Sequence, residues 1–91
     1  MGAIAEAMRA KLTAAFSPTR LDIADDSARH AGHAGARPGG ESHFSVTIES
    51  AAFAGASRVA RQRMVYGALA DELAGPVHAL SVTALAPGEL S

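Results

Sequence analysis

The chain has no cysteine among its 91 residues. Disulfide bonds, thiolate catalysis and ligation of a metal by cysteine are therefore excluded for this chain alone. Any metal cluster bound here would need sulfur ligands from a partner. The four histidines become the main source of metal-binding chemistry, because imidazole is a common metal ligand in proteins.

Aromatic residues are also scarce. The sequence holds three phenylalanines, one tyrosine and no tryptophan. A chain of this length is expected to form one domain, residues 1–91, with a small core and modest stability. The expected core consists of the apolar residues that recur with helical or strand spacing: Ile4, Met8, Leu12, Phe16, Leu21, Ile23, Phe44, Val46, Ile48, Val65, Leu69, Leu73, Leu80 and Val82.

Long apolar runs and an excess of one charge are missing as well. No apolar stretch approaches the length that spans a bilayer, and Met1 to Phe16 carries Glu6, Arg9 and Lys11, which argues against a signal peptide. Eight basic and nine acidic residues give a net charge of -1, a poor match for nucleic acid. We therefore expect a soluble cytoplasmic protein with no membrane association.

Hydrophobic periodicity predicts the order helix, strand, strand, helix, strand. Pro18 is expected to end the first helix, and Ser57 to cap the second. The predicted ranges are a helix over 4–16, strands around 21–23, 43–50 and 77–85, a helical turn around 51–57, and a helix from 57 to about 74. This order predicts an α+β fold in which two helices cover one face of three strands. The crossover through the long helix permits a parallel pairing of the last strand.

Two segments lack a periodic pattern. Residues 28–42 are rich in glycine and alanine, and we predict a flexible surface loop there. Residues 87–91 are expected to be a short tail. No internal repeat is visible, so neither segment suggests a second domain.

The predicted loop carries His30 and His33, whose spacing suits a shared metal ion. Asp25, Asp26 and His43 could complete a tetrahedral zinc shell with them. Solvated loop histidines are the simpler interpretation, and binding by a flexible loop is weakened by the entropy of ordering it. Mononuclear zinc at His30, His33 and His43 remains one alternative.

The other two histidines are assigned to strands. His43 is interpreted as a surface histidine that precedes a strand and hydrogen-bonds nearby backbone. His78 is expected to open the last strand, where the fold fixes the side chain and solvent still reaches it. A ligand role for His78 needs a second donor nearby, and the loop of His30 and His33 is the expected supplier.

Arg58, Arg61 and Arg63 form the basic cluster of the sequence. Cations near a helix N-terminus are unfavourable, so their presence there suggests contact with a partner's carboxylate or with phosphate; a solvated helix start is the alternative. No GxSxG, P-loop, HExxH or Rossmann fingerprint is present. We therefore expect no enzyme activity.

Six segments together resemble the BolA family over about Ile4 to Pro87. They are Leu21 to Ser27, Glu41-Ser42-His43-Phe44, Phe53-x-Gly55, Arg58-Val59-x-Arg61-x-Arg63-x-Val65-Tyr66, Leu69-x-x-Glu72-Leu73 and Val77-His78-Ala79-Leu80. The resemblance implies a fold similar to a class II KH domain, with the order αββααβ, a three-stranded mixed sheet and helices on one face.

The resemblance also implies a role in iron–sulfur cluster assembly and trafficking. Members of the family associate with monothiol glutaredoxins and share a [2Fe-2S] cluster to which the glutaredoxin cysteine and glutathione supply sulfur. His78 matches the family's characteristic nitrogen ligand, and His30 or His33 stands where the loop ligand is expected. The isolated chain is expected to hold no cofactor and to be a monomer or a weak homodimer.

The family also suggests an alternative role, as a KH-like DNA-binding regulator of transcription in stress response and morphology. Gly55-Ala56-Ser57-Arg58 stands near the position of the KH GxxG loop but lacks its final glycine. Gln62 replaces a histidine that is usual in the family, and residues 28–42 make a longer loop than in the shortest members. With its net charge of -1, DNA is the second choice of partner.

Overall fold

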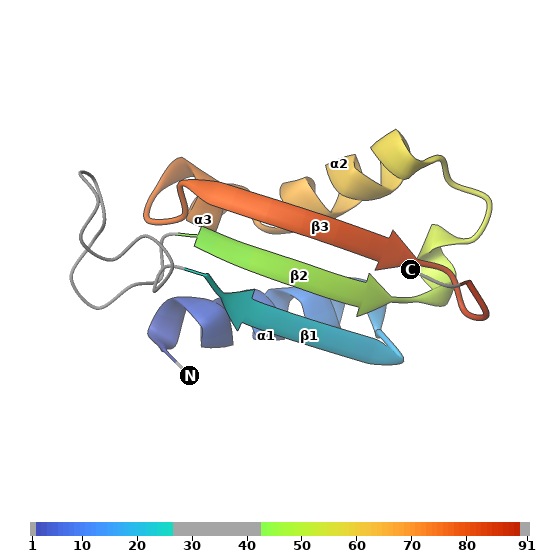
Figure 1. The fold of residues 1–91 in the computed structure, drawn as a ribbon, viewed down its shortest axis with the longest axis horizontal. Helices are drawn as coiled ribbons and strands as arrows, with labels where there is room; N and C mark the ends of the chain where they lie inside the picture. Colours follow the sequence, from blue (N-terminus) through green and yellow to red (C-terminus); the bar gives the residue numbers. More distant parts are fainter. Residues whose placement is uncertain (1, 27–42, 90–91) are drawn as a thin grey trace.

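The computed structural model describes residues 2–26 and 43–89. The elements follow one another, as Figure 1 shows, in the order α1 (Ala3–Phe16), β1 (Arg20–Asp25), β2 (His43–Glu49), the 3-10 turn η2 (Ala51–Phe53), α2 (Arg58–Ala68), α3 (Ala70–Ala74) and β3 (Ala79–Leu85). The predicted α+β fold is confirmed. The loop predicted over 28–42 falls outside the described residues, together with His30 and His33.

The three strands form one mixed sheet in the order β1-β2-β3. β1 is antiparallel to β2, and β2 is parallel to β3, with His43 opposite Ala79 in the register. Parallel pairing places the first residues of β2 and β3 side by side. The last residue of β1, Asp25, pairs with Phe44 and so lies at the same end of the sheet (Figure 1).

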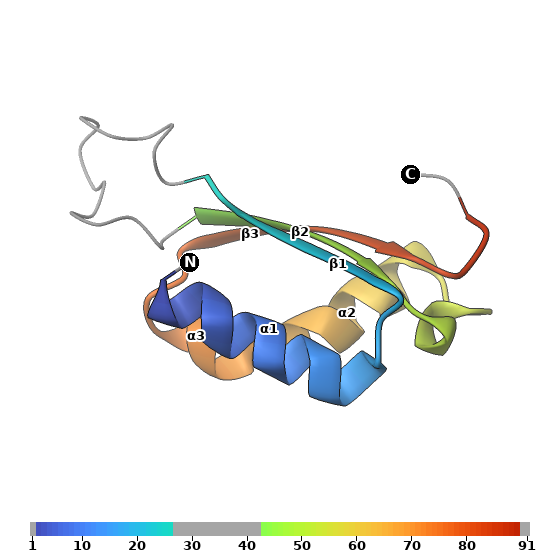
Figure 2. The ribbon, with the colours of Figure 1, turned by 90° about the horizontal axis from the view of Figure 1, so that it is seen from below.

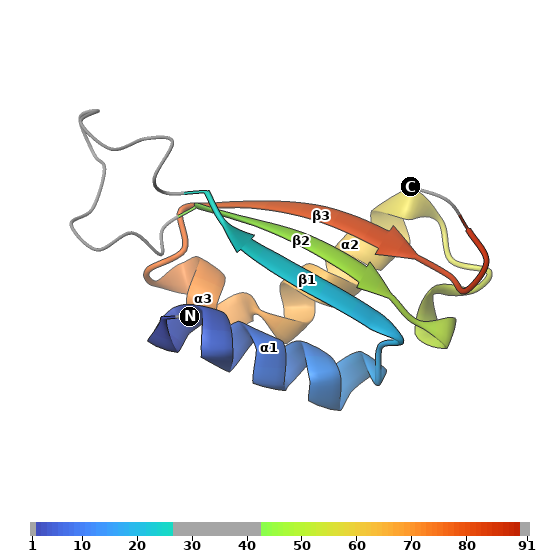
Figure 3. The ribbon, with the colours of Figure 1, turned by 60° about the horizontal axis from the view of Figure 1, so that its bottom comes forward.

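The helices lie on one face of this sheet, as Figures 2 and 3 show. Phe44, Val46 and Ile48 are buried on that face, and the alternate residues of β2 are only partly covered, as expected for a half-buried strand. Every residue of the predicted core is confirmed as buried or packed against buried residues. The sequence pattern missed Phe53 and Val77, both of which are buried.

The helix predicted from Ser57 to about Ala74 is in fact two helices. Ser57 caps α2 as predicted, and its hydroxyl accepts a hydrogen bond from the Ala60 N–H at 3.1 Å. The helix is interrupted at Leu69, whose φ and ψ of -107° and 22° are not helical. Leu69 is fully buried at this break, and its N–H still donates to the Val65 carbonyl at 3.1 Å.

Glu72 is buried although it is charged, and only 9% of the residue is exposed. Its Oε2 accepts a hydrogen bond from Lys11 Nζ at 2.7 Å, which connects α3 to α1. Because the pair spans 61 residues of sequence, a local pattern cannot indicate it. None of the helices within residues 2–26 and 43–89 is long and apolar enough to cross a bilayer.

Candidate functional site: a histidine corner and an arginine end

His78 lies immediately before β3, four residues after Ala74, the last residue of α3. The prediction placed it inside the strand, but β3 begins at Ala79. Val77, on one side, is buried, and its N–H donates to the Glu72 carbonyl at 3.0 Å. Ala79, on the other side, is in register with His43. The side chain of His78 is exposed. The backbone on both sides of it is held in place by the contacts of Val77 and Ala79.

The parallel register brings His43 close to His78. Their ring centroids are 6.5 Å apart and the ring planes are inclined by 30°. His43 is partly buried, and its carbonyl accepts a hydrogen bond from the Asp26 N–H at 2.7 Å. We call this pair, His43 and His78, the histidine corner. The sequence interpretation treated His43 as a surface histidine and did not pair it with His78.

Asp26 lies at the same end of the sheet as the histidine corner. Its backbone N–H donates to the His43 carbonyl, and its carboxylate accepts a hydrogen bond from the Ser45 hydroxyl. Within the described residues, no group of three or more histidine, cysteine, aspartate or glutamate side chains is arranged to hold a metal ion. The described residues therefore provide two imidazoles at this corner, and further ligands would come from elsewhere.

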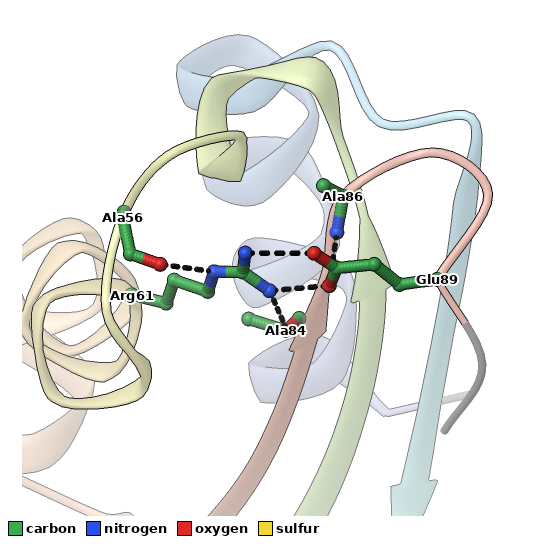
Figure 4. Close-up of polar contacts among 5 residues, drawn as sticks. All are labelled: Ala56, Arg61, Ala84, Ala86 and Glu89. Atoms are coloured by element: carbon green, nitrogen blue, oxygen red, sulfur yellow. Dashed lines mark hydrogen bonds and ion pairs between the residues drawn. The ribbon is translucent and has the colours of Figure 1, made fainter.

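Arg61 lies at the other end of β3 and is largely covered, with 13% of its side chain exposed. Figure 4 shows its contacts with the backbone: Nε donates to the Ala56 carbonyl at 3.0 Å, and Nη1 donates to the Ala84 carbonyl at 3.1 Å. Farther along α2, the Tyr66 hydroxyl approaches the Leu80 carbonyl at 3.4 Å. Side chains of α2 thus satisfy two carbonyls of β3.

The guanidinium of Arg61 also binds Glu89 at two points. Nη1 lies 2.5 Å from Oε1, and Nη2 lies 3.0 Å from Oε2 (Figure 4). These hydrogen bonds, with a further one from the Ala86 N–H, lower the pKa of Glu89 from 4.5 to about 2. Residues 87–91 were predicted to be a tail, and Glu89 was not recognised as a partner of Arg61.

Arg58 and Arg63 are exposed, in contrast to Arg61. A groove of about 460 Å³ runs between the start of α2 and β3. Its lining consists of Ala56, Arg58, Arg61, Gln62, Val82, Thr83, Ala84 and Leu85. The segment compared with a GxxG loop, residues 55–58, therefore contributes two residues to this groove. We call this groove, together with the exposed Arg58 and Arg63 of α2, the arginine end.

Known proteins match this chain both in sequence and in fold. The family model described as BolA-like protein matches residues 12–89. The human BolA-like protein 1 is 43% identical over 89 residues, which is 98% of this chain. The chain belongs to the BolA family.

Other BolA proteins resemble this chain in structure as well as in sequence. The BolA domain of SufE1 from Arabidopsis thaliana superimposes with a TM-score of 0.87 at 41% identity, covering 99% of both chains. The Escherichia coli protein named DNA-binding transcriptional regulator BolA is 44% identical over 79 residues, 87% of this chain and 71% of that protein. This BolA-like chain spans 62% of the length of human BolA-like protein 1.

The histidine corner and the arginine end lie at opposite ends of β3 in this BolA domain. Arg61 contacts β3 at Ala84, and the rise of a strand places this contact about 16 Å from Ala79.

Proposed function

We propose that this BolA-like chain is an accessory protein of iron–sulfur cluster trafficking that forms a heterodimer with a monothiol glutaredoxin. In this complex a [2Fe-2S] cluster is shared cargo: the glutaredoxin cysteine and glutathione supply sulfur, and this chain supplies nitrogen from His78. One observation carries the proposal: His78 is exposed on an anchored backbone with a second imidazole 6.5 Å away.

The composition of the chain supports a shared rather than a private cluster. Without cysteine, the chain cannot supply the thiolates that usually hold such clusters. Imidazole is an accepted substitute on one iron of a two-iron cluster. A second nitrogen from His30 or His33 stays a prediction, because these residues lie outside the described part of the chain. The proposed compartment is the cytoplasm.

Visible absorption and circular dichroism test this function directly. The chain is mixed with a cluster-loaded monothiol glutaredoxin, and the spectrum of wild type is compared with that of His78→Ala. Ser81→Ala is the matched control, because it removes an exposed side chain from β3 itself. We expect a changed spectrum with wild type and with Ser81→Ala but not with His78→Ala. An unchanged spectrum with wild type would contradict the proposed function.

A second candidate function is binding of DNA by the arginine end. It is favoured by the groove between α2 and β3, and by the Escherichia coli relative, which is named a DNA-binding transcriptional regulator. This function predicts affinity that falls steeply with salt and depends on Arg58 and Arg63, while His78→Ala has no effect. Fluorescence anisotropy with a labelled duplex over a range of salt concentrations separates it from the cluster function.

A further inference from the structure

We propose that His43 and His78 form an open, two-imidazole metal site, in which His43 is the second nitrogen donor of this chain. The sequence interpretation assigned that role to His30 or His33. As far as it concerns the shared cluster, the inference rests on the proposed function. As a site for a single metal ion in the isolated chain, it stands on the geometry of the histidine corner alone.

The spacing of the two rings suits one shared metal ion. A metal bonded to an imidazole nitrogen at about 2.0–2.1 Å lies about 3.2 Å from the ring centre. Two such rings at a tetrahedral angle have centres about 5.2 Å apart, against the observed 6.5 Å. A closure of about 1 Å is a small side-chain movement, and His78 is exposed and has room for it.

The backbone on both sides of the corner is already fixed. His43 is the first residue of β2 and pairs with Ala79, while Val77 is held by the core and by the Glu72 carbonyl. Binding therefore orders two side chains and no backbone, and the entropic cost is low. The carboxylate of Asp26, which is hydrogen-bonded to Ser45 two residues along β2 from His43, adds a negative charge at this end of the sheet, and that charge favours a bound cation.

Two protein ligands leave the remaining coordination positions open. A tetrahedral shell needs four ligands, and the described residues hold no group of three donors. Such a site binds a borderline ion such as Cu²⁺, Ni²⁺ or Zn²⁺ moderately, because imidazole suits these metals. It also admits sulfur ligands from a second molecule, which is the requirement for sharing a cluster.

The test uses the isolated chain and Cu²⁺, without any glutaredoxin. Calorimetry gives the affinity, and electron paramagnetic resonance counts the coordinated nitrogens. We expect wild type to bind one ion through two nitrogens. His43→Ala and His78→Ala should each lower affinity by about tenfold or more and leave one nitrogen. The His30→Ala/His33→Ala double variant is the control and should bind like wild type.

The opposite pattern overturns the inference. If the double variant loses the ion while His43→Ala keeps two nitrogens, the ligands are the loop histidines and His43 is not a donor. His43→Gln is measured beside His43→Ala, and the thermal midpoint of each variant shows whether the fold is intact. Copper binding through His43 and His78 with no change in the glutaredoxin spectra would retain this site and reject the proposed function.

Discussion

Arg61 and Glu89 form an ion pair with two hydrogen bonds, although they are 28 residues apart in sequence. The pair joins α2 to the segment that follows β3. The same carboxylate accepts the Ala86 N–H at 3.0 Å, while the guanidinium donates to the Ala84 carbonyl. Arg61 is thus committed to contacts within the chain. Of the three arginines predicted to contact a partner, Arg58 and Arg63 are the exposed ones.

The first prediction concerns acid stability. The Arg61 hydrogen bonds depress the pKa of Glu89 from 4.5 to about 2. The ionised carboxylate therefore stabilises the fold fully above pH 4.5, and this contribution is lost as the pH falls toward 2. Urea unfolding should show Glu89→Gln less stable than wild type at neutral pH, with the difference vanishing near pH 2. A difference that stays constant over this range would contradict the ion-pair account.

The second prediction concerns the core beneath η2. Phe53 is fully buried, and its ring centroid lies 5.1 Å from that of Phe16. Phe53→Ala should lower the free energy of unfolding by about 3–5 kcal/mol, since it leaves a cavity. Val59→Ala truncates a residue that is 58% exposed and should change the free energy by less than about 0.5 kcal/mol. Similar denaturation midpoints for both variants would show that Phe53 does not pack as described.

The third prediction compares two serine caps. Ser50 is buried; its hydroxyl donates to the Phe16 carbonyl at 2.6 Å and accepts from the Ala52 N–H at 3.1 Å. Ser50→Ala leaves both backbone groups without this partner and should cost about 1–3 kcal/mol. Ser57→Ala, at an exposed cap, should cost about 1 kcal/mol. The ranking would be disproved by equal losses in chemical denaturation.

The fourth prediction concerns association with a partner. Replacing both exposed arginines, as Arg58→Glu/Arg63→Glu, should slow heterodimer formation with a monothiol glutaredoxin by several-fold to about tenfold at low salt. Arg20→Glu is the control, because Arg20 lies on β1, the strand at the other edge of the sheet. Stopped-flow measurements over a range of salt concentrations provide the rates. Equal slowing by the control would indicate a general charge effect rather than contact at the arginine end.

Local patterns predicted the fold well. The alternation around Val46 and the hydroxyl of Ser57 are signals that lie within a few residues, and the structure confirms the strand and the cap. The break at Leu69 and the burial of Glu72 escaped prediction. The burial of Glu72 depends on a contact with a distant element, its bond to Lys11, and no local signal marks the break at Leu69.

The site was less predictable than the fold. The exposure of His78 was expected, because a helix stop directly precedes it. The proximity of His43 and His78 follows from the parallel register of β2 with β3. The residues paired in this register are more than thirty positions apart in sequence. Glu89 follows a turn at Pro87-Gly88, and no local signal links that turn to Arg61.

The most direct test of the central claim is to detect nitrogen on the shared cluster. The chain is prepared with histidine that carries the heavy nitrogen isotope, mixed with a cluster-loaded monothiol glutaredoxin, reduced, and studied by pulsed electron paramagnetic resonance. The account predicts a strong coupling from a coordinated imidazole that changes with the isotope and disappears in His78→Ala. A cluster spectrum that is indifferent to the isotope would contradict ligation by this chain.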